Sequence, residues 1–283
     1  MLKVICVIGH GTNLIPHFIK HYKGLYVDEI NFVVYESDLH PDLRNKVEDA
    51  IDGEKGVKIL DFIYDRVFDW ERVTKEYNKF TMEEPETWWI IADIDEFHLY
   101  PMQPRKIAMD CVVNGWEIVR GGFIDRVGKD GNFPQIDEEE DIFNQFPLAG
   151  FFRYPMSGAC PNKICIKKGH VEITPGQHYA KILGHTTWRW QGWSHPQIAP
   201  IENYSVQVHH FKWDSTCLER IRAVANVRKD YSFSDEYKIM YDAIIKNKSR
   251  IDIQNPEFMF EGHVWRYNHY KNWKKLINKI ISI

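Results

Sequence analysis

The chain has 283 residues, a formal net charge of −4 at pH 7 and 44% hydrophobic residues. This length allows one large α/β domain or two smaller ones, and the net negative charge argues against nucleic-acid binding as the main function. Five scattered cysteines predict reduced thiols and argue against a zinc site. With no signal-peptide cleavage site and no apolar run near ~20 residues, we expect a cytoplasmic chain, soluble or peripherally membrane-associated.

The first hundred residues alternate between short apolar runs and helical patterns. Apolar runs at 3–8 and 30–35, and a third that begins at Val57, predict buried parallel strands. Asp69 can cap a following helix whose apolar residues fall at helical spacing. This alternation predicts an α/β fold with an open, mostly parallel twisted sheet flanked by helices, joined later in the chain by a small antiparallel part and C-terminal helices.

Polar residues follow each of these strands. The segment 9–13 (GHGTN) breaks the first strand into a helix, a common way to offer backbone N–H groups to a nucleotide, although the third glycine of the dinucleotide fingerprint is missing. Residues at the ends of the second and third strands often bind a base or ribose, but more often simply end the strand. The predicted nucleotide contacts are Gly9, His10, Gly11, Asn13, Glu36 and Asp65, together with Asp93.

The segment 88–97 (WWIIADIDEF) rises from an apolar run into two carboxylates, Asp93 and Asp95. Alternate residues of a strand face the same way, so we expect both carboxylates to reach one spot. Two carboxylates at the carboxyl end of a buried strand suit a hard divalent cation, Mn²⁺ or Mg²⁺, and the phosphates that it carries. The alternative for so short a motif is a chance pair at a strand end.

The second half of the chain contains further predicted elements. A helix begins at Pro104 and runs to about Val113, a strand covers 117–120, and helices end near 227 and 245. Segments 163–167 and 171–173 are predicted to form a hairpin around 168–170. Residues 273–283 form an amphipathic pattern that suits an anionic membrane surface, although docking on the protein body is the preferred interpretation.

The Asp-Ile-Asp-Glu-Phe sequence at 93–97 resembles the metal-binding signature of glycosyltransferases with the GT-A fold, above all the family 2-like enzymes and the related family 92 group. Other segments similar to this group are the helix ending near Asn78 and residues 121–126, 130–134, 145–147, 163–169, 176–178 and 209–213. The resemblance covers residues 1 to about 225. It implies a GT-A-like catalytic domain over 1–225, with a nucleotide-binding half (1–100) and an acceptor half (101–225), and a C-terminal helical extension over 226–283.

The resemblance also implies roles for individual residues. A nucleotide-sugar donor would lie across the carboxyl ends of the strands, with Asp95 on the metal and Asp93 on ribose or metal-bound water. His210 matches the late histidine that often completes the metal site, and His209 is the alternative. Adjacent residues on a strand face opposite ways, so at most one of the two is a ligand.

Sugar transfer leaves negative charge on a diphosphate, which a bound cation can neutralise. Lys163 or Arg126 is a candidate additional contact to the donor phosphate or sugar. For each residue, the alternative of similar weight is a side chain that is simply exposed to solvent. The resemblance implies transfer with inversion, and an inverting enzyme needs a general base. Asp125 is preferred for this role over Asp137 in the acidic run 137–141. The predicted acceptor contacts, by aromatic stacking on a sugar, are Trp188, Trp190 and Trp193, with His178.

The predicted function is therefore metal-dependent transfer of a hexosyl or deoxyhexosyl group, with inversion, from a nucleotide-sugar to a hydroxyl acceptor. A UDP-sugar is the favoured donor and a glycan the expected acceptor. One alternative is a nucleotidyltransferase, although residues 10–13 lack the basic glycine-rich loop of that class. Another is a non-catalytic carbohydrate-binding protein, against which the intact pair Asp93 and Asp95 counts.

Overall fold

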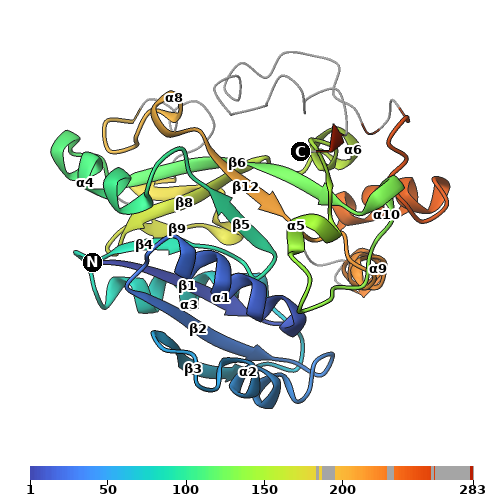
Figure 1. Ribbon diagram of the computed structural model, residues 1–283, viewed down its shortest axis with the longest axis horizontal. Helices are drawn as coiled ribbons and strands as arrows, with labels where there is room; N and C mark the ends of the chain where they lie inside the picture. The colour runs from blue at the N-terminus through green and yellow to red at the C-terminus, as the bar shows by residue number, and fades with distance from the viewer. Residues whose placement is uncertain (183–184, 187–194, 228–232, 256–257, 259–280, 283) are drawn as a thin grey trace. The chain divides into compact units, whose positions relative to one another are not determined.

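The computed structural model describes residues 1–182, 185–186, 195–227, 233–255, 258 and 281–282 (Figure 1). The chain divides into two compact units. The first is Met1–Gly122 with Asn162–Val208, and the second is Phe123–Pro161 with His209–Ile283. Strands β6 (Ile118–Val127) and β12 (Val206–His210) contribute residues to both.

The first unit is built on a large, mostly parallel sheet with the strand order β6-β8-β4-β1-β2-β3. Strand β1 pairs in parallel with β2 and β4, and β2 pairs in parallel with β3, whereas β8 is antiparallel to both β4 and β6. A small antiparallel sheet has the order β11-β10-β9. The predicted fold class is confirmed. The strand bounds are β1 Leu2–Ile8, β2 Glu29–Glu36, β3 Val57–Tyr64, β4 Trp88–Ile91, β5 Glu96–Leu99, β8 Asn162–Lys168, β9 Glu172–Ile173, β10 Ala180–Ile182 and β11 His185–Thr186.

Helices cover both faces of the parallel strands. Phe32 of β2 lies 5.7 Å, between ring centroids, from Phe18 of α1, whereas its neighbour Val33 belongs to the core cluster of Tyr77 of α3. Successive residues of a strand face opposite sides, so both faces of the sheet are buried, and every residue of β1 is buried in consequence. The helices of this unit are α1 Ile15–Gly24, α2 Leu43–Ile51, α3 Trp70–Met82, α4 Pro104–Asn114 and α8 Ile201–Tyr204, with 3₁₀ turns at Thr12–Leu14 and Pro175–Gln177.

The predicted helix starts are confirmed at both positions. The backbone N–H of Glu71 donates to the side chain of Asp69 over 2.9 Å, which caps α3. Pro104 occupies the first turn of α4. A backbone N–H at this position would have no acceptor within the helix, so proline costs no hydrogen bond there. These starts follow from local chemistry alone.

The predicted hairpin around residues 168–170 is wrong. Strand β8 lies between β4 and β6, and β9 pairs with β10. Instead of making a tight two-strand turn, Gly169 donates its N–H to Thr87 O over 2.9 Å, and a Cβ at this position would lie 2.1 Å from Glu84 O. The glycine is therefore required by a close backbone approach.

The second unit packs helices around Trp213, Met240 and Ile244, which are fully buried. Its strand β7 pairs antiparallel with β6 and with β13, so Ile281 and Ser282 are in a strand and the helix predicted for them is wrong. The rest of that predicted helix lies outside the described residues. The unit contains β7 Leu148–Gly150, β13 Ile281–Ser282, α5 Ile142–Gln145, α6 Arg153–Ser157, α9 Cys217–Val227, α10 Ser234–Lys246 and a 3₁₀ turn at Lys129–Gly131.

Candidate functional site

The predicted metal motif lies just beyond the carboxyl end of β4. The strand ends at Ile91, and Asp93 and Asp95 are in the turn that leads into β5. A hydrogen bond from the N–H of Glu96 to Asp93 O, over 3.0 Å, closes this turn. The two aspartates are therefore not on a strand, and the expected strand alternation does not orient them. Strand β4 lies beside β1 in the sheet, so the turn that follows β4 is at the edge where parallel α/β sheets bind ligands.

Asp93 is held by two donors. Its Oδ1 accepts from the hydroxyl of Tyr77 over 2.9 Å, and its Oδ2 lies 3.0 Å from Nζ of Lys163. Burial raises the pKa of Asp93 to about 6; Lys163 acts to lower that pKa, while Glu96 and Asp95 raise it. About a third of the side chain (32%) remains exposed, so one side of this carboxylate faces solvent.

Lys163 is a buried cation at the centre of this group. Its Nζ donates to Asp93, to Glu96 over 2.7 Å and to Gln177. An ammonium group has three protons, and these three acceptors match that number. Burial acts to lower the pKa of Lys163, but Asp93 and Glu96 together raise it above its usual value. A contact between Lys163 and a donor phosphate, as predicted, would have to replace one of these bonds.

Two neighbours complete the buried group. Gln177 has a φ of 52°, unusual for a non-glycine residue, and its side chain is 2% exposed. Nε2 of the buried His98 lies 4.0 Å from Oε2 of Glu96. Burial lowers the pKa of His98, against the opposite effect of Glu96. Glu96, Gln177 and Tyr77 were not predicted as site residues, although each lies in a segment that resembles the glycosyltransferase group: the Asp-x-Asp-Glu-Phe motif, residues 176–178 and the helix ending near Asn78.

Asp95 is 8% exposed and lies in the same turn. Among the described residues, no group of three or more His, Cys, Asp and Glu side chains is arranged to hold a metal ion. Magnesium sites at nucleotides commonly use one or two carboxylates, with water and substrate phosphates supplying the other ligands. The chemistry of Asp93 and Asp95 fits that smaller donor set, and their role as ligands stays a prediction.

The turn after β1 is shaped by its glycines. Gly11 has a φ of 72°, in the left-handed region, and is followed by a 3₁₀ turn, whose Leu14 N–H donates to Gly11 O over 2.9 Å. A Cβ on Gly9 would lie 2.3 Å from the ring of Phe68. The ring of His10 lies 6.1 Å from that of His40 in the loop after β2. Nucleotide contacts from Gly9, His10, Gly11 and Asn13 remain predictions.

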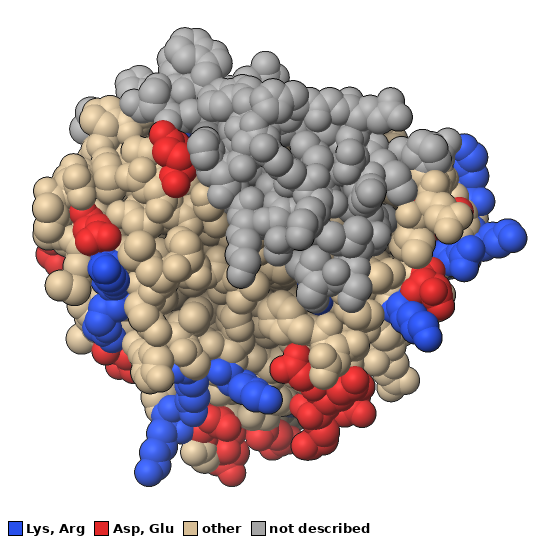
Figure 2. Space-filling view, turned by 45° about the horizontal axis from the view of Figure 1, so that its top comes forward, with Lys and Arg blue, Asp and Glu red and all other residues tan. Residues whose placement is uncertain are grey.

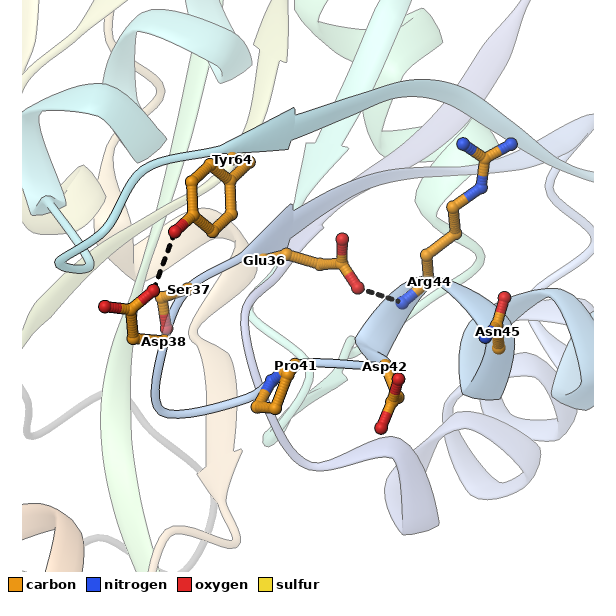
Figure 3. Close-up of a pocket in the computed structure, with 8 residues that line it drawn as sticks. All are labelled: Glu36, Ser37, Asp38, Pro41, Asp42, Arg44, Asn45 and Tyr64. Carbon is orange, nitrogen blue, oxygen red and sulfur yellow. Dashed lines mark hydrogen bonds between the residues drawn. The ribbon is translucent and has the colours of Figure 1, made fainter.

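The residues predicted at the ends of β2 and β3 have different surroundings. Oδ2 of Asp65 accepts from the hydroxyl of Tyr35 over 2.8 Å. Glu36 lies in a hollow that also contains Tyr64, drawn in Figure 3, and its Oε1 accepts from the N–H of Arg44 over 3.0 Å. Their predicted nucleotide contacts are untested.

In the second unit, both oxygens of Asp125 are engaged. Oδ1 accepts from Nε1 of Trp213 over 3.3 Å, and Oδ2 accepts from the backbone N–H of Arg153 over 2.9 Å. Nδ1 of His210 lies 3.9 Å from Asp125 Oδ1 and 3.5 Å from a guanidinium nitrogen of Arg153. With 1% of its side chain exposed, Asp125 is placed to orient its neighbours. Its predicted role as the base needs a proton path that these contacts do not supply.

Arg126 faces a different set of side chains. It is 1% exposed, lies over the rings of Phe143 and Phe211, and donates to Phe143 O over 3.3 Å. Burial lowers the pKa of Arg126 to about 10. The structure describes no carboxylate within ion-pair distance of it, which is uncommon for a buried guanidinium. His209 is also buried and makes an edge contact with Phe143 at 5.7 Å.

The remaining predicted residues are scattered. His178 is close to Asn162, with Nδ1 2.7 Å from its carbonyl oxygen. Asp137 is exposed, and its Oδ1 accepts from the N–H of Glu139 over 2.8 Å. Trp188, Trp190 and Trp193 lie outside the described residues.

The described surface carries charges of both signs. Figure 2 shows acidic and basic side chains interspersed, with broad uncharged areas between them. No helix in the described parts of the chain is long and apolar enough to cross a bilayer.

Comparisons with known proteins give no family. No family model matches the sequence, and no curated protein matches it. One similar solved structure is a mannose-6-phosphate isomerase from Helicobacter pylori, with 13% identity, a TM-score of 0.32, and coverage of 60% of this chain and 71% of that one. Another is described as a glucose-1-phosphate thymidylyltransferase from Bacillus anthracis in complex with sucrose, with 11% identity, a TM-score of 0.31, and coverage of 87% and 84%. At these TM-scores neither similarity supports an inference about function.

Proposed function

We propose that this chain is a metal-dependent glycosyltransferase that moves a sugar, with inversion, from a nucleotide-sugar to a hydroxyl acceptor. A UDP-sugar is the favoured donor and a glycan the favoured acceptor. The observation that carries the proposal is the placement of Asp93 and Asp95 in one turn at the carboxyl end of β4, a strand that lies next to β1 in the sheet. Two carboxylates suit a divalent ion whose other ligands are water and the phosphates of a substrate, whereas Glu96 is engaged by Lys163.

Asp93 and Asp95 would hold the cation, Mn²⁺ or Mg²⁺. When bound, such an ion supplies positive charge that stabilises a departing diphosphate. Tyr77 and Lys163 orient the Asp93 carboxylate through its two oxygens, which leaves its exposed side for ligand or metal-bound water. Glu96 keeps Lys163 in place by accepting a hydrogen bond of 2.7 Å from its Nζ.

Binding assays test the proposal directly. Thermal shifts with UDP, GDP, dTDP and nucleoside triphosphates, each with and without Mn²⁺, should show metal-dependent stabilisation by a nucleoside diphosphate. If none stabilises the protein in this way, the proposal fails. If a nucleoside triphosphate and a sugar 1-phosphate together release pyrophosphate, the protein is a nucleotidyltransferase instead. If sugars bind without any metal-dependent nucleotide binding, it is a carbohydrate-binding protein.

A variant pair assigns the site. Asp95→Ala should abolish metal-dependent hydrolysis of the donor while the melting temperature changes little. Asp52→Ala, at an exposed acid after α2, is the matched control and should keep wild-type hydrolysis. Unchanged hydrolysis in Asp95→Ala would remove the metal role from this residue.

A further inference from the structure

The outer face of helix α4 carries a cluster of exposed apolar side chains. Met109, Val112 and Val113 are 65%, 61% and 84% exposed, whereas Ile107 and Cys111 on the opposite face are buried. Figure 1 shows α4 (green, at left) at the periphery of the first unit. Single exposed apolar residues are ordinary, but several on one helix face indicate an interaction surface.

Helical periodicity arranges these side chains in a stripe. At about 100° per residue, Met109 and Val113 lie about 40° apart around the helix axis and form the centre of the exposed face. Val112 lies on one flank of this centre. Lys106 and Asp110, which are about one turn apart, lie on the other flank. The face therefore has an apolar centre and one flank on which a cation is followed by an anion.

The two charges on this flank are not compensated within the described chain. Lys106 is exposed and Asp110 is half-buried, and neither forms an ion pair with a described residue. On the other flank, Arg105 is paired with Asp28 over 2.8 Å. The face thus carries one uncompensated charge of each sign, which gives it no net attraction for an anionic lipid surface.

A second copy of α4 supplies the complementary pattern. When two copies pair antiparallel about a two-fold axis, the same flank of each helix meets in opposite directions. Lys106 of each copy then lies opposite Asp110 of the other, with Met109 at the centre of the contact and Val113 toward each end. A parallel pair would instead bring Lys106 toward Arg105 of the other copy, where like charges repel.

We propose that this chain forms a homodimer through an antiparallel pair of α4 helices. A contact one helix face wide is at the small end of specific protein interfaces, so the dimer has a dissociation constant of about 1–100 μM. None of the residues proposed to bind the donor or the cation lies on this face. The dimer is therefore independent of the proposed transfer reaction.

Analytical ultracentrifugation of the full chain, from low to high micromolar concentration, measures the association. Wild type should show a reversible equilibrium between monomer and dimer. Val113→Glu places a charge in the apolar stripe and should weaken association about 10-fold or more. Because this side chain is exposed, the melting temperature should equal that of wild type at a concentration where both are monomeric.

The matched control is Leu39→Glu, which makes the same charge change at an exposed apolar residue in the loop after β2. This variant should associate as wild type does. A chain that stays monomeric at every concentration would overturn the proposal, as would a dimer that Val113→Glu leaves unchanged.

Mixed variants test the antiparallel pairing. Lys106→Glu gives the flank two carboxylates and Asp110→Lys gives it two ammonium groups, so each variant alone should associate about 3- to 10-fold more weakly than wild type. An equimolar mixture places opposite charges across both contacts and should form a heterodimer with about wild-type affinity. If the mixture associates no better than the separate variants, the antiparallel pairing is overturned.

Cosedimentation with vesicles of phosphatidylcholine and phosphatidylserine distinguishes this contact from a membrane contact. Wild type and Val113→Glu should sediment with the vesicles to the same extent. Vesicle binding by a chain that is monomeric in solution, and its loss in Val113→Glu, would assign the face to a lipid surface and overturn the dimer.

Discussion

Nζ of Lys163 lies 2.7 Å from Oε1 of Glu96, and the exposed fractions of the two side chains are 1% and 2%. Two charges withdrawn from water in this way cost free energy that only close pairing offsets. The same ammonium group also holds Asp93 at the exposed margin of the turn. A structural ion pair thus connects the core of the first unit to its predicted metal ligands.

Removal of the cation should destabilise the first unit. Lys163→Met leaves Glu96 buried without its counter-ion, and we expect a loss of about 3–5 kcal/mol in the free energy of unfolding, measured by urea denaturation at neutral pH. The double variant Lys163→Met with Glu96→Gln should recover part of the loss. Lys168→Met, which removes a pair with the exposed Glu86, is the control and should cost less than about 1 kcal/mol.

Lys167 should give the protein a distinct pH dependence. Burial lowers its pKa from 10.5 to about 7. Between these values the unfolded chain binds more protons than the folded one, so the free energy of unfolding rises with pH across that window. Relative to Lys167→Met, wild type should gain up to about 1.4 kcal/mol per pH unit between about pH 7 and pH 10, by urea denaturation. A constant difference across this range would contradict the lowered pKa.

Gly169 should tolerate no side chain. A Cβ there would lie 2.1 Å from Glu84 O and 2.5 Å from Thr81 O, both backbone atoms. Gly169→Ala should therefore cost about 1–3 kcal/mol or more, measured as a lower urea midpoint. In Gly24→Ala the new methyl meets nothing within 4 Å at the end of α1. That control should be neutral or stabilising by up to about 1 kcal/mol.

Asp125→Asn separates a structural from a chemical role. In the variant, an NH₂ group replaces one of the two carboxylate oxygens that accept from Arg153 and Trp213. Because an NH₂ group cannot accept a hydrogen bond from an N–H donor, one buried hydrogen bond is lost. We expect a loss of about 1–3 kcal/mol in stability. Asp137→Asn at the exposed acidic run should stay within about 0.5 kcal/mol. Wild-type stability together with intact donor binding and lost transfer would instead support Asp125 as the base.

Local chemistry explains which parts of the fold could be predicted. The apolar runs of β1 and β2 are long enough to indicate burial on both faces, and the helix starts at Asp69 and Pro104 depend on neighbouring atoms alone. The position of β8 is set by pairing with strands far away in the sequence. Its apolar run indicates a buried strand but does not identify the partner, which is why the hairpin prediction failed.

The site shows the same division. The sequence singled out Asp93, Asp95 and Lys163, but it did not connect Lys163 with Asp93, 70 residues away. It also continued the strand past Ile91, because apolar and acidic residues alternate through Ala92-Asp93-Ile94-Asp95 as they do on a strand, with neither glycine nor proline among them.

The antiparallel strand β8 carries Lys163, so the counter-charge of the acidic turn is synthesised 70 residues after Asp93. A nascent chain that has completed β1, β2 and β4 still holds Asp93 and Glu96 without the ammonium group that neutralises them in the folded unit. Bringing Lys163 to the acidic turn closes a long loop of chain, and the conformational entropy lost in closing that loop opposes formation of the ion pair. The acidic turn therefore acquires its native charge balance only after β8 has left the ribosome, and translation order sets when this site matures.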